Sequence, residues 1–204
     1  MSHYPVHVTF PGRLIFVGFG SIGQGVLPLI LRHVGIQPDQ ITIVTADEAG
    51  GKVAAEYGVR FVKHPLTREN FKNVLDPLVG RGDFLLNLSV DVSSLALVQL
   101  CWEKGALYLD TCIEPWPGGY TDPTISPAKR TNYALRESAL ALRETVKRAP
   151  TAVLTHGANP GLVSHFLKQA LLNIATDTGV EHGDPNTREE WAALAHKLGV
   201  KVIH

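Results

Sequence analysis

Three glycines near the start of the sequence have the spacing of a phosphate-binding loop. Gly18, Gly20 and Gly23 form a G-x-G-x-x-G pattern, preceded by an apolar run at residues 13–17 and followed by helical apolar spacing over residues 26–33. In a strand–loop–helix unit such glycines permit a tight turn, close backbone approach to a pyrophosphate and close helix packing. Free N–H groups at the helix start attract phosphate charge. The pattern therefore predicts a dinucleotide site.

A second predicted strand supplies the acidic residue that such a site needs. Residues 41–44 are apolar or β-branched, and Asp47 follows them. A ribose-binding carboxylate is expected roughly 20 residues beyond the glycine loop. Asp47, with Glu48 as the second candidate, favours NAD over NADP because a carboxylate repels the 2′-phosphate. Without this context the glycines would indicate only a tight turn.

Strand-like and helix-like segments alternate along most of the chain. Further strands are expected at residues 59–62, 83–88, 106–109 and 151–155, and helices at residues 49–57, from Thr67 to Leu78, from Ser93 or Ser94 to Lys104, and at residues 132–147. The alternation predicts an α/β fold, namely a Rossmann-type, doubly wound, mostly parallel sheet with helices on both faces.

The rest of the chain predicts a long loop, two helices and an incomplete element. Residues 113–129 are rich in proline and glycine, and loops of this length are often functional. A helix is expected to about Thr176, and Thr187 to Glu190 form a capping box for another. Residues 200–204 are expected to begin a strand.

These elements suggest one complete domain followed by the beginning of a second. We expect an NAD-binding domain over residues 1–160. Residues 161–204 are expected to hold linking helices and the beginning of a truncated substrate domain.

Polar residues follow the predicted strands at one edge of the sheet, where ligands of open α/β sheets bind. They are Asn87, Ser89, Asp91, Asp110, Thr111, Glu114, His156 and Asn159, and the apolar Pro160 follows the last strand with them. Small polar groups can hydrogen-bond a nicotinamide ribose or amide. Asp91 and Glu114 can hold an ammonium group or move a proton during amine oxidation. The set predicts NAD-dependent chemistry on an amine.

Structural alternatives exist for the same residues. Asp91 precedes a helix and can cap it. Glu114 can be a solvated loop carboxylate, and Trp116 can pack in the core rather than hold a cation. Asn159 and His156 can belong to a turn at a helix start.

Composition bears on partners and location. The 204 residues carry 19 basic and 19 acidic side chains, which argues against nucleic-acid or membrane-surface binding. No apolar run reaches the length of a membrane span. Cys101 and Cys112 are too few for a disulfide framework, and no cysteine or histidine spacing indicates a metal site. A cytoplasmic location is expected.

Five segments together resemble the bacterial homospermidine synthases, which are NAD-dependent relatives of saccharopine dehydrogenase. They are residues 18–23, 87–91, 108–111, 114–116 and 157–161. The resemblance covers essentially the whole chain. Members of that family are more than twice as long, so the chain resembles their N-terminal part.

The resemblance implies a transferase of polyamine biosynthesis that uses NAD as a recycled hydride carrier. Putrescine is oxidised to an imine, a second putrescine attacks, ammonia leaves, and reduction gives homospermidine. The implied substrates are diamines, putrescine or spermidine, and the implied full-length form is a homodimer.

Matching segments assign roles to individual residues. The resemblance places Asp91, Glu114 and Asn159 at the reacting amine as catalytic residues. Together with the residue pattern, it predicts NAD contacts from Gly18, Gly20, Ser21, Ile22, Gly23, Asp47, Asn87, Ser89, Thr111, Ala158 and Pro160. Further functional residues of the family lie beyond His204.

Two other functions compete with this interpretation. One is a saccharopine dehydrogenase-like NAD(P) oxidoreductase acting on an amino acid, which needs a cation for the substrate carboxylate. No convincing arginine follows the predicted strands. The other is an NAD-binding module without activity of its own.

Overall fold

A computed structural model describes residues 4–203 as two compact units, the first ending at Thr155 and the second beginning at His156. A six-stranded sheet forms the centre of the first unit. Its strands are β2 (Leu14–Val17), β4 (Ile41–Thr45), β5 (Arg60–Lys63), β6 (Phe84–Asn87), β7 (Leu107–Asp110) and β8 (Ala152–Val153). All strand pairs are parallel, in the order β5-β4-β2-β6-β7-β8. This is the strand order of Rossmann folds, so the predicted fold class is confirmed.

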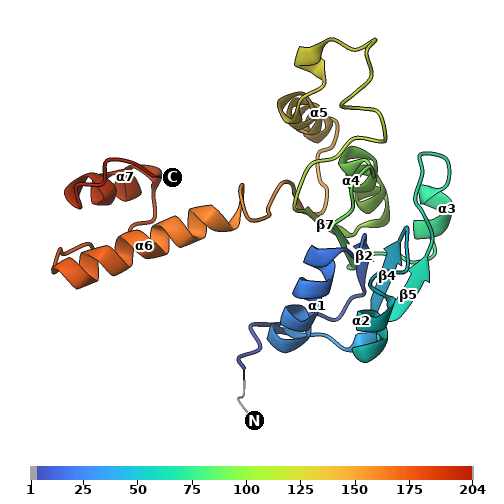
Figure 1. The fold of residues 1–204 in the computed structure, drawn as a ribbon, viewed down its shortest axis with the longest axis horizontal. Helices are drawn as coiled ribbons and strands as arrows, with labels where there is room; N and C mark the ends of the chain where they lie inside the picture. Colours follow the sequence, from blue (N-terminus) through green and yellow to red (C-terminus); the bar gives the residue numbers. More distant parts are fainter. Residues whose placement is uncertain (1–3, 204) are drawn as a thin grey trace. The chain divides into compact units, whose positions relative to one another are not determined.

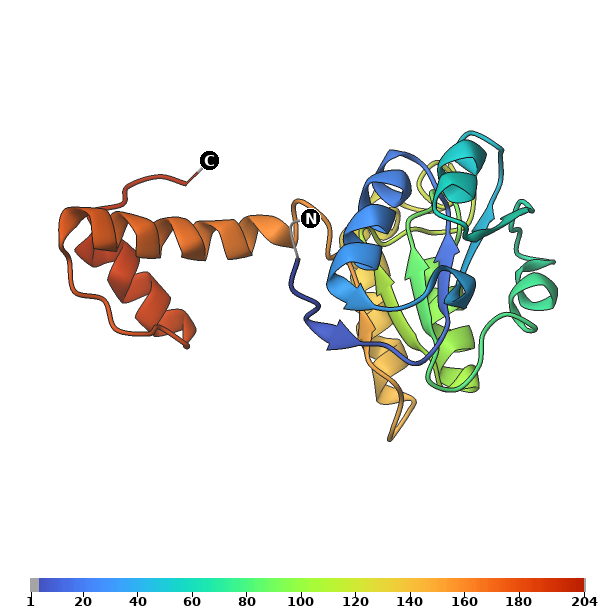
Figure 2. The same cartoon turned by 90° about the horizontal axis from the view of Figure 1, so that it is seen from below.

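Helices cover both faces of this sheet (Figures 1 and 2). They are α1 (Ser21–His33), α2 (Gly51–Glu56), α3 (Phe71–Leu75), α4 (Ser94–Lys104) and α5 (Asn132–Glu144), with 3-10 turns at Pro38–Gln40 and Pro127–Lys129. One core cluster contains Leu27 of α1 together with Phe16, and the other contains Leu97 of α4 together with Ile15. Because successive side chains of a strand point to opposite faces, β2 contributes to both cores.

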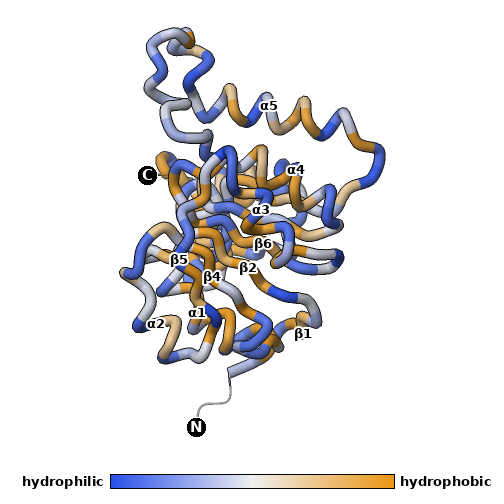
Figure 3. The backbone as a smooth tube through the Cα atoms, turned by 90° about the vertical axis from the view of Figure 1, so that its right-hand side faces the viewer, coloured by the Kyte–Doolittle hydropathy of each residue, from blue (hydrophilic) through white to orange (hydrophobic). Residues whose placement is uncertain are grey.

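The central strands form the apolar interior of the unit (Figure 3). Strand β2 reads Leu-Ile-Phe-Val and is buried at every position. A strand covered on both faces has no polar alternation, which explains the continuous apolar run in the sequence. A separate parallel pair is formed by β1 (Val8–Thr9) and β3 (Val34–Gly35).

The second unit is helical and contains α6 (Leu162–Thr178) and α7 (Arg188–Lys197). Thr187 Oγ1 accepts a hydrogen bond from Glu190 N at 3.2 Å, and Glu190 Oε2 accepts one from Thr187 N at 2.9 Å, so the predicted capping box is confirmed. The predicted domain division after residue 160 stays a prediction. Within residues 4–203 no helix is both long and apolar enough to cross a bilayer.

The predicted helix from Thr67 to Leu78 is wrong in its extent. The Thr67 carbonyl accepts hydrogen bonds from Asn70 N and Phe71 N, so Thr67 begins a turn and α3 follows it. The helix ends at Leu75, and Pro77 lacks the N–H that would continue its hydrogen-bond ladder.

The predicted strand at residues 200–204 is also wrong over its described part, residues 200–203, and His204 lies outside the described residues. Val200 N instead donates to Ala195 O at 3.1 Å, as part of the turn that ends α7. A strand needs a neighbour for its backbone groups, and residues 156–203 hold no strand that could pair with it.

Candidate functional site

The glycine loop lies between β2 and α1. Gly18 has φ +85°, and a Cβ on it would lie 2.7 Å from the backbone N and Cα of Ser89. Its own N–H donates to Val44 O at 2.8 Å. Gly18 is therefore required both for the turn and for the close approach of the loop after β6.

Phe19 fixes the conformation of this loop. Its ring lies between Gly23 and Gly50, and a Cβ on either glycine would overlap the ring. The side chain is buried and makes an edge contact with Phe16 at a centroid distance of 5.8 Å. Gly23 thus makes room for the ring of Phe19. The sequence predicted only that Gly23 allows close packing of the helix.

The start of α1 is open to a ligand. Helix α1 begins at Ser21, directly after Gly20, and a Cβ on Gly20 would meet no atom of residues 4–203 within 4 Å. The N-cap makes no side-chain hydrogen bond, and the first turn holds no acidic residue. The N–H groups of Ser21, Ile22 and Gly23 are therefore without a side-chain cap, as at helix starts that bind phosphate.

Asp47 lies just beyond β4. Its Oδ1 accepts a hydrogen bond from Ala49 N at 2.9 Å, which fixes the turn after the strand. Glu48, the second candidate, pairs with Lys63 at 2.9 Å. The assignment of a ribose to Asp47, with Glu48 as the second candidate, stays a prediction.

Asp91 does not cap a helix. Helix α4 is capped by Ser93, whose Oγ accepts a hydrogen bond from Ala96 N at 3.4 Å. Asp91 is exposed, has φ +61° and, among the described residues, makes no side-chain hydrogen bond or ion pair. The capping alternative is therefore wrong, and a residue in this sparsely populated conformation is typical of functional loops.

Glu114 follows β7 on a backbone tied to the start of α4. Glu114 N donates to Ser94 Oγ at 3.0 Å, and Ser94 N donates to Glu114 O at 2.9 Å. Trp116 packs on Phe71 with ring centroids 5.4 Å apart, and both belong to the core under α3 and α4. The packing alternative for Trp116 therefore has direct support.

The thiol of Cys112 is partly buried beside Glu114. Partial burial, a hydrogen bond with Glu114 and the charges of Glu114 and Asp110 raise the pKa of Cys112 to about 11. Because the thiolate is the reactive form, we expect iodoacetamide at pH 8 to label Cys112 about tenfold to a hundredfold more slowly in the folded than in the urea-unfolded chain. Glu114→Gln should accelerate the labelling. Equal rates in the folded and unfolded chains would contradict this geometry.

Ala158, Asn159 and Pro160 belong to the second unit. Gly157 N donates to Pro160 O at 2.9 Å, and Leu162 N donates to Gly157 O at 2.8 Å. These bonds form a closed turn at the start of α6, with Asn159 exposed. The backbone of Asn159 therefore belongs to a turn at a helix start, as the structural alternative predicted. The Asn159 side chain is exposed and is available to a ligand.

The remaining predicted residues meet at one edge of the first unit, the carboxyl edge, where the parallel strands end. The glycine loop and the loops that carry Asp47, Asp91 and Glu114 follow β2, β4, β6 and β7, which are neighbours in the sheet. Ile22 and Val90 are large apolar side chains exposed at this edge, 60% and 76% respectively. Such an edge offers apolar contact surfaces next to polar groups, as ligand sites do.

The sequence interpretation missed two residues below this edge. Tyr108 was expected only as part of a strand and Ser94 only as a possible helix cap, yet both are fully buried polar groups. No local sequence signal marks these two residues, because their neighbours Asn87 and Asp110 come together only through the register of β6 and β7.

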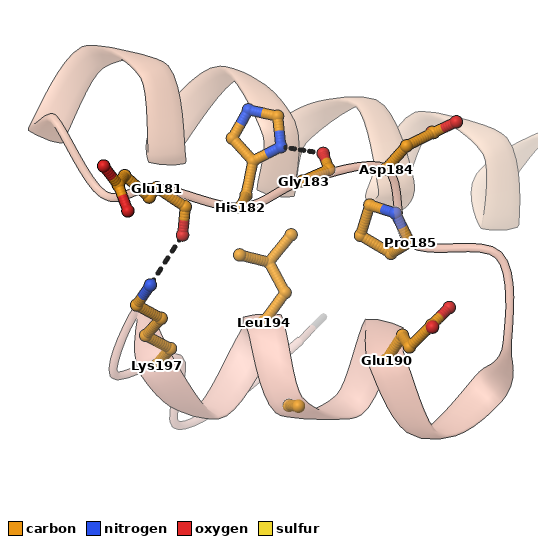
Figure 4. Close-up of a pocket in the computed structure, with 9 residues that line it drawn as sticks. Glu181, His182, Gly183, Asp184, Pro185, Glu190, Leu194 and Lys197 are labelled. Atoms are coloured by element: carbon orange, nitrogen blue, oxygen red, sulfur yellow. Dashed lines mark hydrogen bonds between the residues drawn. The ribbon is translucent and has the colours of Figure 1, made fainter.

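A pocket of about 520 Å³ lies in the second unit (Figure 4). Its polar groups already stabilise local structure. Lys197 Nζ donates to Glu181 O at 2.6 Å, and Glu190 accepts hydrogen bonds from the backbone of Asn186 and Thr187, which lower its pKa. We assign no ligand to this pocket. Across residues 4–203 no group of three or more acidic, histidine or cysteine side chains is arranged to hold a metal ion.

Comparison with known proteins identifies the first unit. Residues 14–154, from the start of β2 to just beyond β8, match the family model of the saccharopine dehydrogenase NADP binding domain. The chain belongs to this family. The predicted relation to saccharopine dehydrogenase is thereby confirmed.

The individual proteins to which the chain is similar are homospermidine synthases. Over 100% of its length the chain is 48% identical to a homospermidine synthase of Blastochloris viridis and 44% identical to one of Mesorhizobium japonicum. It spans 43% of each, which is less than half their length. The crystal structure of the homospermidine synthase from Legionella pneumophila in complex with NAD matches with a TM-score of 0.76 and 44% identity, over 95% of this chain and 40% of that one. The predicted resemblance is confirmed.

Proposed function

We propose that this chain is the NAD-binding part of a homospermidine synthase, which converts two putrescines to homospermidine and ammonia. The main observation behind this proposal is the carboxyl edge, which brings together the glycine loop, with its uncapped helix start, and the carboxylates of Asp91 and Glu114. The chain is also similar to homospermidine synthases over its full length. The homospermidine synthases to which the chain is similar are more than twice as long, so the whole reaction is proposed for a protein of that length.

The residues present fit NAD. The space above Gly20 and the uncapped N–H groups of α1 suit a pyrophosphate, and Asp47 suits the hydroxyls of the adenosine ribose. Asn87, Ser89 and Thr111 are assigned to the remainder of the cofactor, and Ile22 to an apolar contact. The NAD contacts of Ala158 and Pro160, which belong to the second unit, stay predictions from the resemblance. When bound, NAD supplies a hydride acceptor.

Asp91 and Glu114 would act on the diamine. Their carboxylates hold ammonium groups through charge-assisted hydrogen bonds and receive the proton that an amine must lose before oxidation. Asp91 suits this role because its carboxylate has no partner among the described residues. The role of Asn159, which belongs to the second unit, stays a prediction from the resemblance.

Calorimetric titration of the chain with NAD and NADP, followed by putrescine added to the NAD complex, tests the proposal. NAD should bind more tightly than NADP. Asp91→Asn and Glu114→Gln should each weaken putrescine binding about tenfold or more while leaving NAD affinity within about twofold. Glu103→Gln is the matched control, since Glu103 pairs with Lys72 near the carboxyl end of α4.

The possible results separate the competing functions. Putrescine binding that is unchanged in both variants would overturn the assignment of the carboxylates. NADH accumulation with an amino acid but not with putrescine would favour the saccharopine dehydrogenase-like oxidoreductase. Failure to bind either dinucleotide would reject the cofactor site itself.

A further inference from the structure

A network of four buried polar side chains lies directly beneath the carboxyl edge. Asn87, Ser94, Tyr108 and Asp110 come from β6, α4 and β7, and none is more than 1% exposed. Tyr108 Oη donates to Asp110 Oδ2 at 2.8 Å and accepts from Asn87 Nδ2 at 3.1 Å. The tyrosine hydroxyl thus joins the ends of two neighbouring strands.

Three members of the network, Asn87, Ser94 and Asp110, each accept a hydrogen bond from the backbone of a different loop. Asn87 Oδ1 accepts hydrogen bonds from Ser89 N at 3.2 Å and Ser89 Oγ at 2.6 Å. Ser94 Oγ accepts from Glu114 N at 3.0 Å. Asp110 Oδ1 accepts from Thr155 N at 2.5 Å.

These three attachment points coincide with the proposed site. Ser89 is a predicted NAD contact two residues before Asp91, and Glu114 is a predicted catalytic residue. Thr155 ends the first unit and has φ +58°, a conformation that costs energy for a β-branched residue. Such backbone persists only where neighbouring bonds hold it.

The network is maintained at an electrostatic cost. Burial raises the pKa of the Asp110 carboxyl, against the opposing effect of its bonds with Thr155, Ser94 and Tyr108. Burial likewise raises the pKa of Tyr108 well above its usual range, and the charge of Asp110 raises it further. Well-packed apolar side chains often stabilise a core as much as a buried polar network does, because the polar groups must first lose their hydration.

We propose that Tyr108 and Asp110 are positioning residues that hold the loops after β6, β7 and β8 in the geometry that binds the dinucleotide. The inference rests on the proposed NAD-binding function. Neither residue touches the ligand in this assignment; both act through Ser89, Glu114 and Thr155.

Tyr108→Phe removes one hydroxyl and keeps the ring, so it tests the network without removing the core packing. We expect amide exchange of Ser89 and Thr155, measured by NMR, to accelerate about tenfold because Asn87 and Asp110 lose their common partner. NAD affinity in calorimetry should fall about tenfold. Tyr133→Phe, at a tyrosine that is 79% exposed, is the matched control and should change neither quantity.

A second variant separates positioning from a general loss of stability. Ile43→Val shortens a fully buried side chain of the core that contains α1 and α2, and it should destabilise the fold modestly without accelerating exchange at Ser89 and Thr155 selectively. Equal loss of NAD affinity in Ile43→Val and Tyr108→Phe would overturn the positioning role. Unchanged exchange in Tyr108→Phe, or faster exchange with full NAD affinity, would overturn it as well.

The two proposals fail in different ways. If the wild-type chain binds no dinucleotide, the proposed function fails, and amide exchange still decides whether the network holds the loops. If the wild type binds NAD and Tyr108→Phe matches it in affinity and exchange, only the positioning inference fails.

Discussion

Gly18→Ala is expected to abolish NAD binding and to lower the free energy of unfolding by about 3 kcal/mol. Two effects add at this position. Alanine is strained at φ +85°, and its Cβ would lie 2.7 Å from the Ser89 backbone, which belongs to a neighbouring loop and cannot yield as a flexible side chain would. The loop after β6 would have to move, and with it the approach to the pyrophosphate.

Gly82→Ala separates the two effects. Gly82 has φ +82°, nearly the value at Gly18, but a Cβ there would meet nothing within 4 Å. We expect this control to lose only about 1 kcal/mol and to bind NAD normally. Urea unfolding and calorimetry measure both quantities. Normal NAD binding by Gly18→Ala would refute the role given to the loop.

Asp83→Ala is expected to lower the free energy of unfolding by about 2–3 kcal/mol, mainly because two backbone N–H groups lose a buried acceptor. The Asp83 side chain is only 7% exposed and accepts hydrogen bonds from Arg13 N, Nε and Nη2 and from Gly80 N, all between 2.7 and 2.9 Å. These bonds join the amino ends of β2 and β6. Removing the carboxylate leaves two backbone donors and a guanidinium without their acceptor.

The position of Asp83 predicts that NAD affinity stays unchanged in the Asp83→Ala variant. It lies at the amino ends of the strands, opposite the carboxyl edge, so NAD affinity should stay within about twofold while the chain is folded. Glu103→Ala is the control, because the Lys72–Glu103 pair is about half exposed on both sides and should contribute less than about 1 kcal/mol. A loss at Asp83 no larger than at Glu103 would contradict the prediction.

These variants distinguish two kinds of glycine and carboxylate that look alike in the sequence. Gly18 and Gly82 both lie in turns next to strands. Asp83 directly precedes β6, and Asp91 lies in the loop that follows it. Packing around them differs: Gly18 and Asp83 are enclosed by other segments, whereas Gly82 and Asp91 face open space. The expected effects follow from that enclosure.

Much of the fold could be predicted because its signals are local. The strand–glycine–helix unit, the stop of α4 at Gly105 and the capping box at Thr187 depend on hydrogen bonds or periodicity within a few residues. The alternation of strands and helices then restricted the sheet to a parallel arrangement, and the strand ends indicated where Asp47, Asp91 and Glu114 would gather.

Other features depend on segments that are distant in sequence. The enclosure of Phe19 by Gly50, the pairing of Asn87 with Tyr108 and the attachment of Thr155 to Asp110 arise only when strand register brings those residues together. The absence of a strand at residues 200–203 has the same origin, because a strand exists only with a neighbour to accept its backbone bonds. The sequence therefore indicated which groups are candidates to bind a dinucleotide and an amine, whereas long-range packing decided which buried side chains make hydrogen bonds to the backbone of three of their loops.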